Sequence, residues 1–549
     1  MEHLVTGSLL LMLAVVVSGW VGRALPVPVP LPLIQILLGV LVSVFTHEGL
    51  GLEPHVFFLF FLPPLLFLDG WRIPKDGLFK DSGTIVELAL GLVVFSVIGI
   101  GYLVHWMIPA MPLAVAFALA AALSPTDPVA VAAITKRTPL PRRLVHILEG
   151  ESLLNDATGL VCMRFAVAAV ITGSFSAAAA AMNFLWLALG GITIGVGTIL
   201  LIQVCQDLIA RRLGEEPGSK VLIGLLMPFA AYLAAEHLHA SGILAAVAAG
   251  ITMSYLEQSG RALPETRVRR AAVWDMVQFG LNGAMFVLLG EQLPMVGASA
   301  AGAMREAGTA EPAMLIAYIL VVTLAMIALR FTWVWVSFRF TLFRRRRAGE
   351  PAPALGSRLL LATSFAGARG SITLAGIMTL PFLVDGAPFP GRDLAIFIAA
   401  GVVILSITLA GVFLPLLLKG LALPPEEGRQ RVERRARHAA ALAAMDAVER
   451  VQHDEHEITQ GSVTWLEAAA RVSADYRRRI EGIQKTGQEA EELRRAHAIE
   501  RELRLAALRA ERETYFRLGR EGKVPDDLVR RLVAEIDHAE TRLAAAIGH

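Results

Sequence analysis

The chain has 549 residues, of which 55% are hydrophobic and only 18% are charged, and its formal net charge is +2. Soluble proteins carry charge on about a quarter of their residues, so this composition and a mean hydropathy of +0.59 exclude an ordinary soluble globular protein. Two cysteines exclude a disulfide framework, and no nucleic-acid partner is expected.

Apolar runs of roughly 18–25 residues recur from residue 4 to residue 418, and each is long enough to cross a bilayer as a helix. The first run lacks a preceding basic region, so we expect a retained span and not a signal peptide. The predicted spans lie near 4–22, 28–46, 55–71, 84–106, 112–134, 146–171, 182–205, 219–237, 241–256, 272–293, 312–338, 357–380 and 393–418. The expected fold is therefore all-α and polytopic, with about thirteen transmembrane helices.

Lysine and arginine collect in every second loop between these spans. They are dense at residues 136–143 and 344–347, whereas the intervening loops hold only Arg305 and Arg392. Because cytoplasmic loops are enriched in basic residues, this alternation predicts an N-terminus outside and a cytoplasmic C-terminus.

The composition changes abruptly at Pro424-Pro425, beyond which Arg, Glu and Ala dominate. We predict two domains, a transmembrane domain over 1–422 and a helical cytoplasmic tail over 423–549. The last tail helix is expected to open at Asp526 and to carry one apolar face. Regulation, dimerisation and solubility all remain open as roles of the tail.

Two predicted spans contain sequences that break a helix. The fifth carries Ser124-Pro125-Thr126-Asp127-Pro128, and the twelfth carries Gly367-Ala368-Arg369-Gly370-Ser371. Proline removes backbone donors and glycine weakens helices. The two spans are seven apart, so they cross the membrane in opposite directions. Interrupted helices at matching positions of two inverted halves indicate the binding site of a transporter, and we predict repeats of spans 1–6 and 8–13.

Polar side chains gather near the middle of the bilayer at these breaks. Ser152 and Asp156 are four residues apart on one face of the sixth span, and Glu151 and Asn155 form a neighbouring stripe. Unwound backbone near Asp127 would free carbonyl groups, notably that of Thr126. Carboxylate, hydroxyl and carbonyl oxygens suit a hard monovalent cation such as Na⁺, so the predicted cation ligands are Asp156, Asp127, Ser152 and Thr126.

A carboxylate this deep in the membrane indicates a site for a cation or a proton, because burial disfavours its charged form unless one of these neutralises it. Competition between the two ions for Asp156 would give exchange, and a single exchanging charge would make it electroneutral and one-for-one. Arg369 stays protonated and needs an acidic partner, for which we choose Glu151 as a structural ion pair. The alternative is a static network that holds the broken helices together.

Other polar residues in the spans have less specific interpretations. Glu149 could gather cations at the inner mouth, but a solvated charge at a helix end is the favoured reading. Asp275, Gln278 and Asn282 follow an i, i+3, i+7 spacing on the tenth span, and we favour hydrogen bonds between helices for them over a transport role.

At these motifs the sequence resembles the sodium/proton exchanger branch of the monovalent cation/proton antiporter superfamily. The resemblance covers about residues 4–420 and rests on the breaks at 124–128 and 367–370, on Gly150–Asp156, and on the segment Phe61–Gly70. It implies a thirteen-span fold with inverted repeats, a homodimer and an elevator-like movement of the core.

The resemblance also implies roles for individual residues. Asp156 would be the essential exchanging carboxylate, with Asp127 in support. Thr126 would contribute its backbone, Ser152 its hydroxyl, and Asn155 would stabilise the unwound crossing. Glu151 and Arg369 look like the family's ion pair. Asn155 in front of Asp156 resembles the branch associated with electroneutral exchange.

The expected function is antiport of Na⁺, with Li⁺ or K⁺ as alternatives, for H⁺ across the plasma (inner) membrane, in the service of pH homeostasis. The expected partners are monovalent cations, protons, the lipid bilayer and a second copy of the chain. A K⁺/H⁺ antiporter, a channel and a membrane sensor remain the alternatives. No cofactor and no enzymatic activity are expected, because no nucleophile–base pair or phosphate loop is present.

Overall fold

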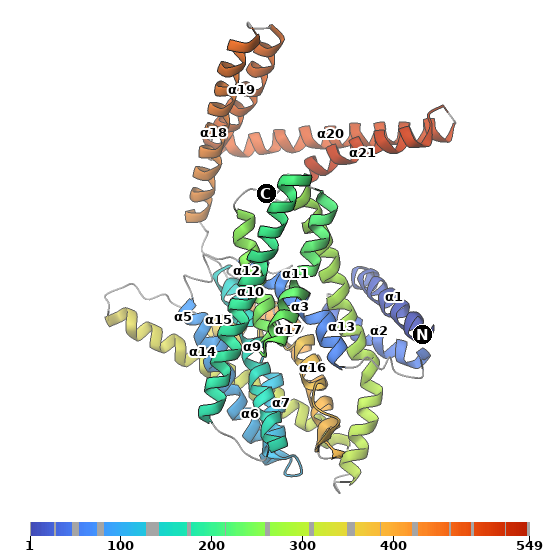
Figure 1. Ribbon diagram of the computed structural model, residues 1–549, viewed down its shortest axis with the longest axis vertical. Helices are drawn as coiled ribbons and strands as arrows, with labels where there is room; N and C mark the ends of the chain where they lie inside the picture. Colours follow the sequence, from blue (N-terminus) through green and yellow to red (C-terminus); the bar gives the residue numbers. More distant parts are fainter. Residues whose placement is uncertain are drawn as a thin grey trace. The chain divides into compact units, whose positions relative to one another are not determined.

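The computed structural model describes residues 2–26, 29–46, 54–73, 82–127, 142–172, 177–214, 216–258, 264–306, 312–347, 357–384, 386–419, 427–459, 463–484, 488–521 and 523–545. The chain divides into two compact units, Met1–Ala422 and Leu423–His549. Unit 1 is a bundle of helices, shown in blue to orange in Figure 1.

The helices of unit 1 follow the apolar runs of the sequence. They are α1 (Glu2–Ala24), α2 (Leu31–Thr46), α3 (Pro54–Arg72), α5 (Ser82–Val86), the π-helix η1 (Glu87–Leu92), α6 (Val93–Met107), α7 (Leu113–Leu123), α9 (Arg142–Thr172), α10 (Ala177–Leu213), α11 (Pro217–His237), α12 (Gly242–Gln258), α13 (Pro264–Glu306), α14 (Pro312–Arg347), α15 (Ser357–Phe365), α16 (Ser371–Met378) and α17 (Arg392–Leu418). A two-residue hairpin, β1 (Leu383–Val384) with β2 (Ala387–Pro388), precedes α17.

Every predicted span has a helical counterpart. Among the described residues, eight helices are long and apolar enough to cross a membrane by themselves, and three shorter helices are also apolar. The count of thirteen crossings remains a prediction. The fourth span is continuous from α5 through η1 to α6, and the twelfth is divided between α15 and α16. The second half of the fifth span, from Pro128, lies outside the described residues.

Helix contacts in unit 1 obey an internal symmetry. If α1, α2, α3, α7 and α9 correspond to α11, α12, α13, the α15–α16 pair and α17, the largest contacts of one half have counterparts in the other. The contact of α2 with α13 corresponds to that of α12 with α3, and the contact of α7 with α9 to that of α16 with α17. Because the halves are offset by seven spans, this is the pattern of inverted repeats.

Close helix crossings at these symmetric positions depend on glycine. A Cβ at Gly39 or Gly290 would overlap a backbone carbonyl across the α2–α13 contact, and a Cβ at Gly70 or Gly250 would do so across the α3–α12 contact. Small residues allow membrane helices to approach backbone to backbone. The two glycine pairs thus place α2 against α13 and α3 against α12 in equivalent ways.

The contacts also sort the helices of unit 1 into two sets. One set, here called the core set, contains α5, η1, α6, α7, α9 and α14–α17. The other, the scaffold set, contains α1–α3 and α10–α13. Both broken spans belong to the core set. Large apolar side chains of α10 remain exposed, for example Trp186 and Leu189, as expected of a helix that faces lipid.

Unit 2 contains four helices, α18 (Glu427–Thr459), α19 (Val463–Gln484), α20 (Gln488–Arg520) and α21 (Asp526–Ala545). α18 packs on α19, and α20 packs on α21. Val529, Val533 and Ile536 are buried along α21. Of the predicted apolar positions Leu528, Leu532, Ile536, Ala539 and Leu543, Ile536 is buried and the others are half-buried. Arg512 of α20 donates to Asp537 at 2.9 Å and to Glu540 at 2.5 Å, and these hydrogen bonds link α20 to α21.

Candidate ion-binding site

The two broken spans meet at their breaks. α7 ends at Leu123, and residues 124–127 are non-helical, as are residues 367–370 between α15 and α16. The Asp127 amide donates to the Ala368 carbonyl at 2.8 Å. A backbone bond between interrupted helices is possible because prolines and glycines release peptide groups from their own helices. The crossing predicted from sequence is therefore present, and it brings Asp127 beside residues 241 positions away.

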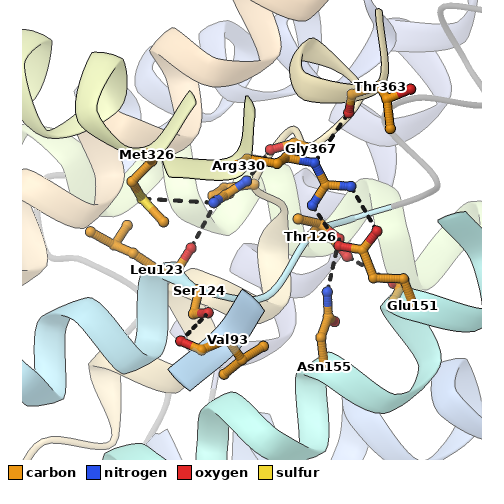
Figure 2. A network of polar contacts seen from close by, with 12 residues as sticks. Val93, Leu123, Ser124, Thr126, Glu151, Asn155, Met326, Arg330, Thr363 and Gly367 are labelled. Carbon is orange, nitrogen blue, oxygen red and sulfur yellow. Dashed lines mark hydrogen bonds and ion pairs between the residues drawn. The ribbon is translucent and has the colours of Figure 1, made fainter. Parts of the chain in front are cut away.

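Thr126 connects this crossing to α9. Its backbone carbonyl accepts a hydrogen bond from the Ser152 hydroxyl at 2.7 Å, and its own hydroxyl accepts one from the Asn155 amide at 2.9 Å. Figure 2 shows Asn155 directed toward Thr126, with Glu151 on the same helix. Both of these partners of Thr126 come from one face of α9, since residues three apart lie on one helix face.

The two aspartates predicted to bind the ion are both buried. Asp156 is 3% exposed and Asp127 is 9% exposed. The Asp127 carboxylate lies against the backbone of Gly370, where a Cβ would overlap it, at the residue that precedes α16. The start of a helix carries a partial positive charge, so α16 offers Asp127 favourable electrostatics. The Asp156 carboxylate interacts electrostatically with Asp127 and also with Asp69.

The predicted ion pair between Glu151 and Arg369 is corrected by the structure. Glu151 instead pairs with Arg330 of α14, with guanidinium-to-carboxylate distances of 2.5 and 2.7 Å (Figure 2). Both side chains are at most 2% exposed. The third nitrogen of Arg330 donates to the Thr363 carbonyl at 3.1 Å. Two parallel hydrogen bonds match the planar geometry of a guanidinium and a carboxylate, so the basic partner of Glu151 is Arg330.

Arg369 takes a different role at the same crossing. Its guanidinium donates to the Leu123 carbonyl at 2.8 Å and to the Gly367 carbonyl. Leu123 is the last residue of α7, and Gly367 follows the end of α15. Carbonyl groups at helix C-termini lack partners within the helix and carry partial negative charge. Arg369 thus neutralises the two helix ends that face each other, and backbone carbonyls replace the carboxylate that we expected.

Two charged residues near the site were missed by the sequence analysis. Arg330 lies outside the break motifs and has no acidic neighbour in its span, although a lone arginine in an apolar span is itself a signal of a buried partner. Asp69 was noted only as part of the segment Phe61–Gly70. It is half-buried near the end of α3 and interacts electrostatically with Asp127 and Glu149.

The polar stripe predicted on the tenth span is confirmed for two of its three members. Asp275 and Gln278 of α13 both accept hydrogen bonds from Arg72 of α3, at 2.5 and 2.7 Å. These are bonds between helices, as the spacing indicated. Glu149 is half-buried and lies one to two helical turns before Ser152 and Asp156 on α9.

The arrangement can hold a partly dehydrated cation. Carboxylate oxygens of Asp156 and Asp127, the Ser152 hydroxyl and the Thr126 carbonyl are oxygen donors gathered at one helix crossing, and hard cations favour such donors. Burial makes an unneutralised carboxylate costly there, so the same group can exchange a cation for a proton.

Comparison with known proteins agrees with this geometry. Residues 10–420 match the family described as "Sodium/hydrogen exchanger, transmembrane". The chain is 38% identical over 544 residues to a protein of Escherichia coli (strain K12) named "Uncharacterized Na(+)/H(+) exchanger YjcE", covering 97% of this chain and 98% of that one. It is 43% identical over 415 residues to the "Sodium, potassium, lithium and rubidium/H(+) antiporter" of Bacillus subtilis (strain 168), covering 74% of this chain and 60% of that one.

A solved structure shares the fold. The sodium proton antiporter MjNhaP1 from Methanocaldococcus jannaschii matches with a TM-score of 0.57 and 19% sequence identity, covering 76% of this chain and 99% of that one. The family consists of multi-pass transporters and not of enzymes. The chain therefore belongs to the transmembrane sodium/hydrogen exchanger family of monovalent cation/proton antiporters.

Proposed function

We propose that this protein exchanges cytoplasmic Na⁺ for external H⁺ across the plasma membrane, one ion for one proton, at a site built around Asp156. The observation that carries the proposal is the meeting of the two broken spans, Asp127 to Ala368, beside the buried Asp156 carboxylate. The name of the Bacillus subtilis relative supports K⁺, Li⁺ and Rb⁺ as further ions, so a K⁺/H⁺ antiporter is the second candidate.

The exchange follows from competition for Asp156. With a proton bound, the carboxylate is neutral and its burial costs little. Loss of that proton leaves a charge that a cation neutralises, aided by the oxygens of Asp127, Ser152 and Thr126. Neither the empty anion nor a doubly loaded site is favoured at low dielectric, so only the two loaded forms should move between the membrane faces. Since one carboxylate exchanges, no net charge moves.

The surrounding residues would hold the crossing rigid while its occupancy changes. Asn155 and Ser152 bind Thr126, Arg330 binds Glu151, and Arg369 binds the end of α7. The core set of helices would then move against the scaffold set as a body, which is the elevator movement. We further propose a homodimer, an outside N-terminus and a cytoplasmic tail, with the tail as a separate domain over 423–549.

Proton movement in sealed proteoliposomes with an imposed pH gradient tests this function. Na⁺, Li⁺ and K⁺ are added in turn, and valinomycin with K⁺ clamps the voltage in the Na⁺ and Li⁺ runs. We expect a cation-triggered collapse of the gradient that is insensitive to voltage. Absence of a response to all three ions from inserted, folded protein would contradict the proposal. A response that depends on voltage would contradict only the one-for-one ratio.

A further inference from the structure

An ion pair joins α3 to α13 near the cytoplasmic end proposed for both helices. Arg72, the last residue of α3, donates to the Asp275 carboxylate at 2.5 Å and to the Gln278 amide oxygen at 2.7 Å. The Arg72 side chain is 40% exposed and that of Asp275 is 69% exposed. A pair this exposed contributes only ~0–1 kcal/mol to stability, so its charge matters more than its strength.

Arg72 also lies beside the carboxylates that lead to Asp156. Asp69 precedes it by one turn on α3, where residues three apart are neighbours. The Asp69 carboxylate interacts electrostatically with Arg72, with Glu149 of α9 and with Asp127, and Asp156 interacts in turn with Asp69. Arg72 therefore stands one turn from Asp69 on α3, and α3 packs on α9, the helix that carries Glu149 and Asp156.

Among the described residues, a second charged pair joins α12 to α13. Glu257 of α12 pairs with Arg270 of α13, and its second carboxylate oxygen accepts a hydrogen bond from the Trp71 indole at 2.7 Å. Arg270 and Glu257 thus leave little net charge beside Arg72. Of the described charged groups, Arg72, Asp275, Asp69 and Glu149 therefore contribute to the potential at the cytoplasmic opening toward Asp156, here called the cytoplasmic mouth.

We propose that Arg72 lowers the affinity of the cytoplasmic mouth for cations and that Asp275, by holding and balancing Arg72, limits this effect. The inference rests on the proposed function, with Asp156 as the exchanging group reached from the cytoplasm. Arg72 and Asp275 act on the ion through the local potential and are positioning residues. Fixed charges of one sign raise or lower the local concentration of a charged substrate in this way.

The test compares the KM for Na⁺ in everted membrane vesicles, whose cytoplasmic face is outside, for the full chain and three variants. Arg72→Gln should lower the KM about two- to fivefold, as expected for one charge removed near a partly solvated surface. Asp275→Asn should raise it by a similar factor. The double variant should have a KM near that of the full chain, since two charges of opposite sign are lost together from one local potential. The maximal rate should change little.

Ionic strength supplies a readout that a purely structural role would not alter. The differences in KM should shrink when choline chloride raises the salt concentration, because the Debye length falls from ~10 Å at 0.1 M to ~3 Å at 1 M. Arg269→Gln is the matched control, because it removes the same charge from a pair with Glu265 on the same helix α13. We expect its KM to stay unchanged.

The outcomes separate this inference from the proposed function. Wild-type exchange with an unchanged KM in Arg72→Gln overturns the inference and leaves the function intact. A double variant shifted as far as Arg72→Gln alone also overturns it, because the Asp275 charge would then contribute nothing to the local potential. No exchange by folded wild-type protein overturns both. Thermal unfolding of each purified variant identifies any loss of folding.

Discussion

Glu151 and Arg330 are 179 residues apart in the sequence and form a two-pronged ion pair with distances of 2.5 and 2.7 Å. The pair joins α9 of the first repeat to α14 of the second, within the core set of helices. Both side chains are almost completely buried. The pair therefore links the two halves across the crossing, and Glu151 of the motif at 150–156 has a structural role.

Breaking this pair should destabilise the protein strongly. Removal of one partner leaves an uncompensated buried charge, so Glu151→Gln and Arg330→Gln should each lower the free energy of unfolding by ~3–5 kcal/mol. The double variant should lose less than the sum of the two. Thermal unfolding in detergent measures all three. Additive losses would contradict a direct pair.

Arg369 should be coupled to Glu151 more weakly than Arg330 is, because its hydrogen bonds go to carbonyl groups. Its guanidinium binds the carbonyl groups of Leu123 and Gly367, so Arg369→Gln should lower the unfolding temperature by exposing two helix ends to mutual repulsion. Combination with Glu151→Gln should give losses closer to additive than the combination of Glu151→Gln with Arg330→Gln. A coupling between Arg369 and Glu151 as large as that between Arg330 and Glu151 would support the ion pair predicted from the sequence. Arg369→Lys is the control that retains the charge.

Asp156→Asn should abolish exchange and leave the fold intact. The amide keeps the shape of the side chain but can neither release a proton nor neutralise a cation. Proteoliposome assays should show no cation-triggered proton movement, with an unfolding temperature within a few degrees of wild type. Retained exchange by folded Asp156→Asn protein would remove Asp156 from the assigned role.

Gly370→Ala should impair exchange through Asp127. A Cβ at this position would overlap the Asp127 carboxylate, which must then move away from the start of α16. We expect a raised KM for the cation, and a loss of stability of ~1–3 kcal/mol from overpacking. Gly83→Ala is a matched control, because a Cβ there meets nothing within 4 Å. An unchanged KM in Gly370→Ala would argue against Asp127 as a ligand.

Gly290→Ala should separate α2 from α13. The new methyl group would overlap the Ile36 carbonyl, and backbone cannot retreat as a flexible side chain can. We expect a loss of ~1–3 kcal/mol in unfolding experiments. Gly280→Ala, on the same helix with open space around the new Cβ, should be neutral or stabilising by up to ~1 kcal/mol, since alanine favours helix. Equal effects of the two would contradict the close crossing.

Local features of the chain were sufficient to predict much of this protein. Apolar runs determine helices, because a spanning segment must satisfy its own backbone in lipid. The prolines at 125 and 128 and the glycines at 367 and 370 mark the breaks, because they remove or weaken hydrogen bonds wherever they stand. The spacing of Ser152, Asn155 and Asp156 likewise places them together on α9 without knowledge of the fold. These effects act over a few residues and can be read in order.

Partnerships between distant segments were decided by tertiary structure alone. Glu151 could be expected to need a cation, but Arg330 and Arg369 are both arginines in apolar spans, and only the packing of α14 against the crossing selects Arg330. Arg369 meets carbonyl groups because α7 and α15 end beside it. Asp69 and Arg72 acquire their significance from α9 and α13, which pack on α3. A charge interacts with whatever the fold brings near, and that neighbourhood is a property of the packed bundle and not of the local sequence.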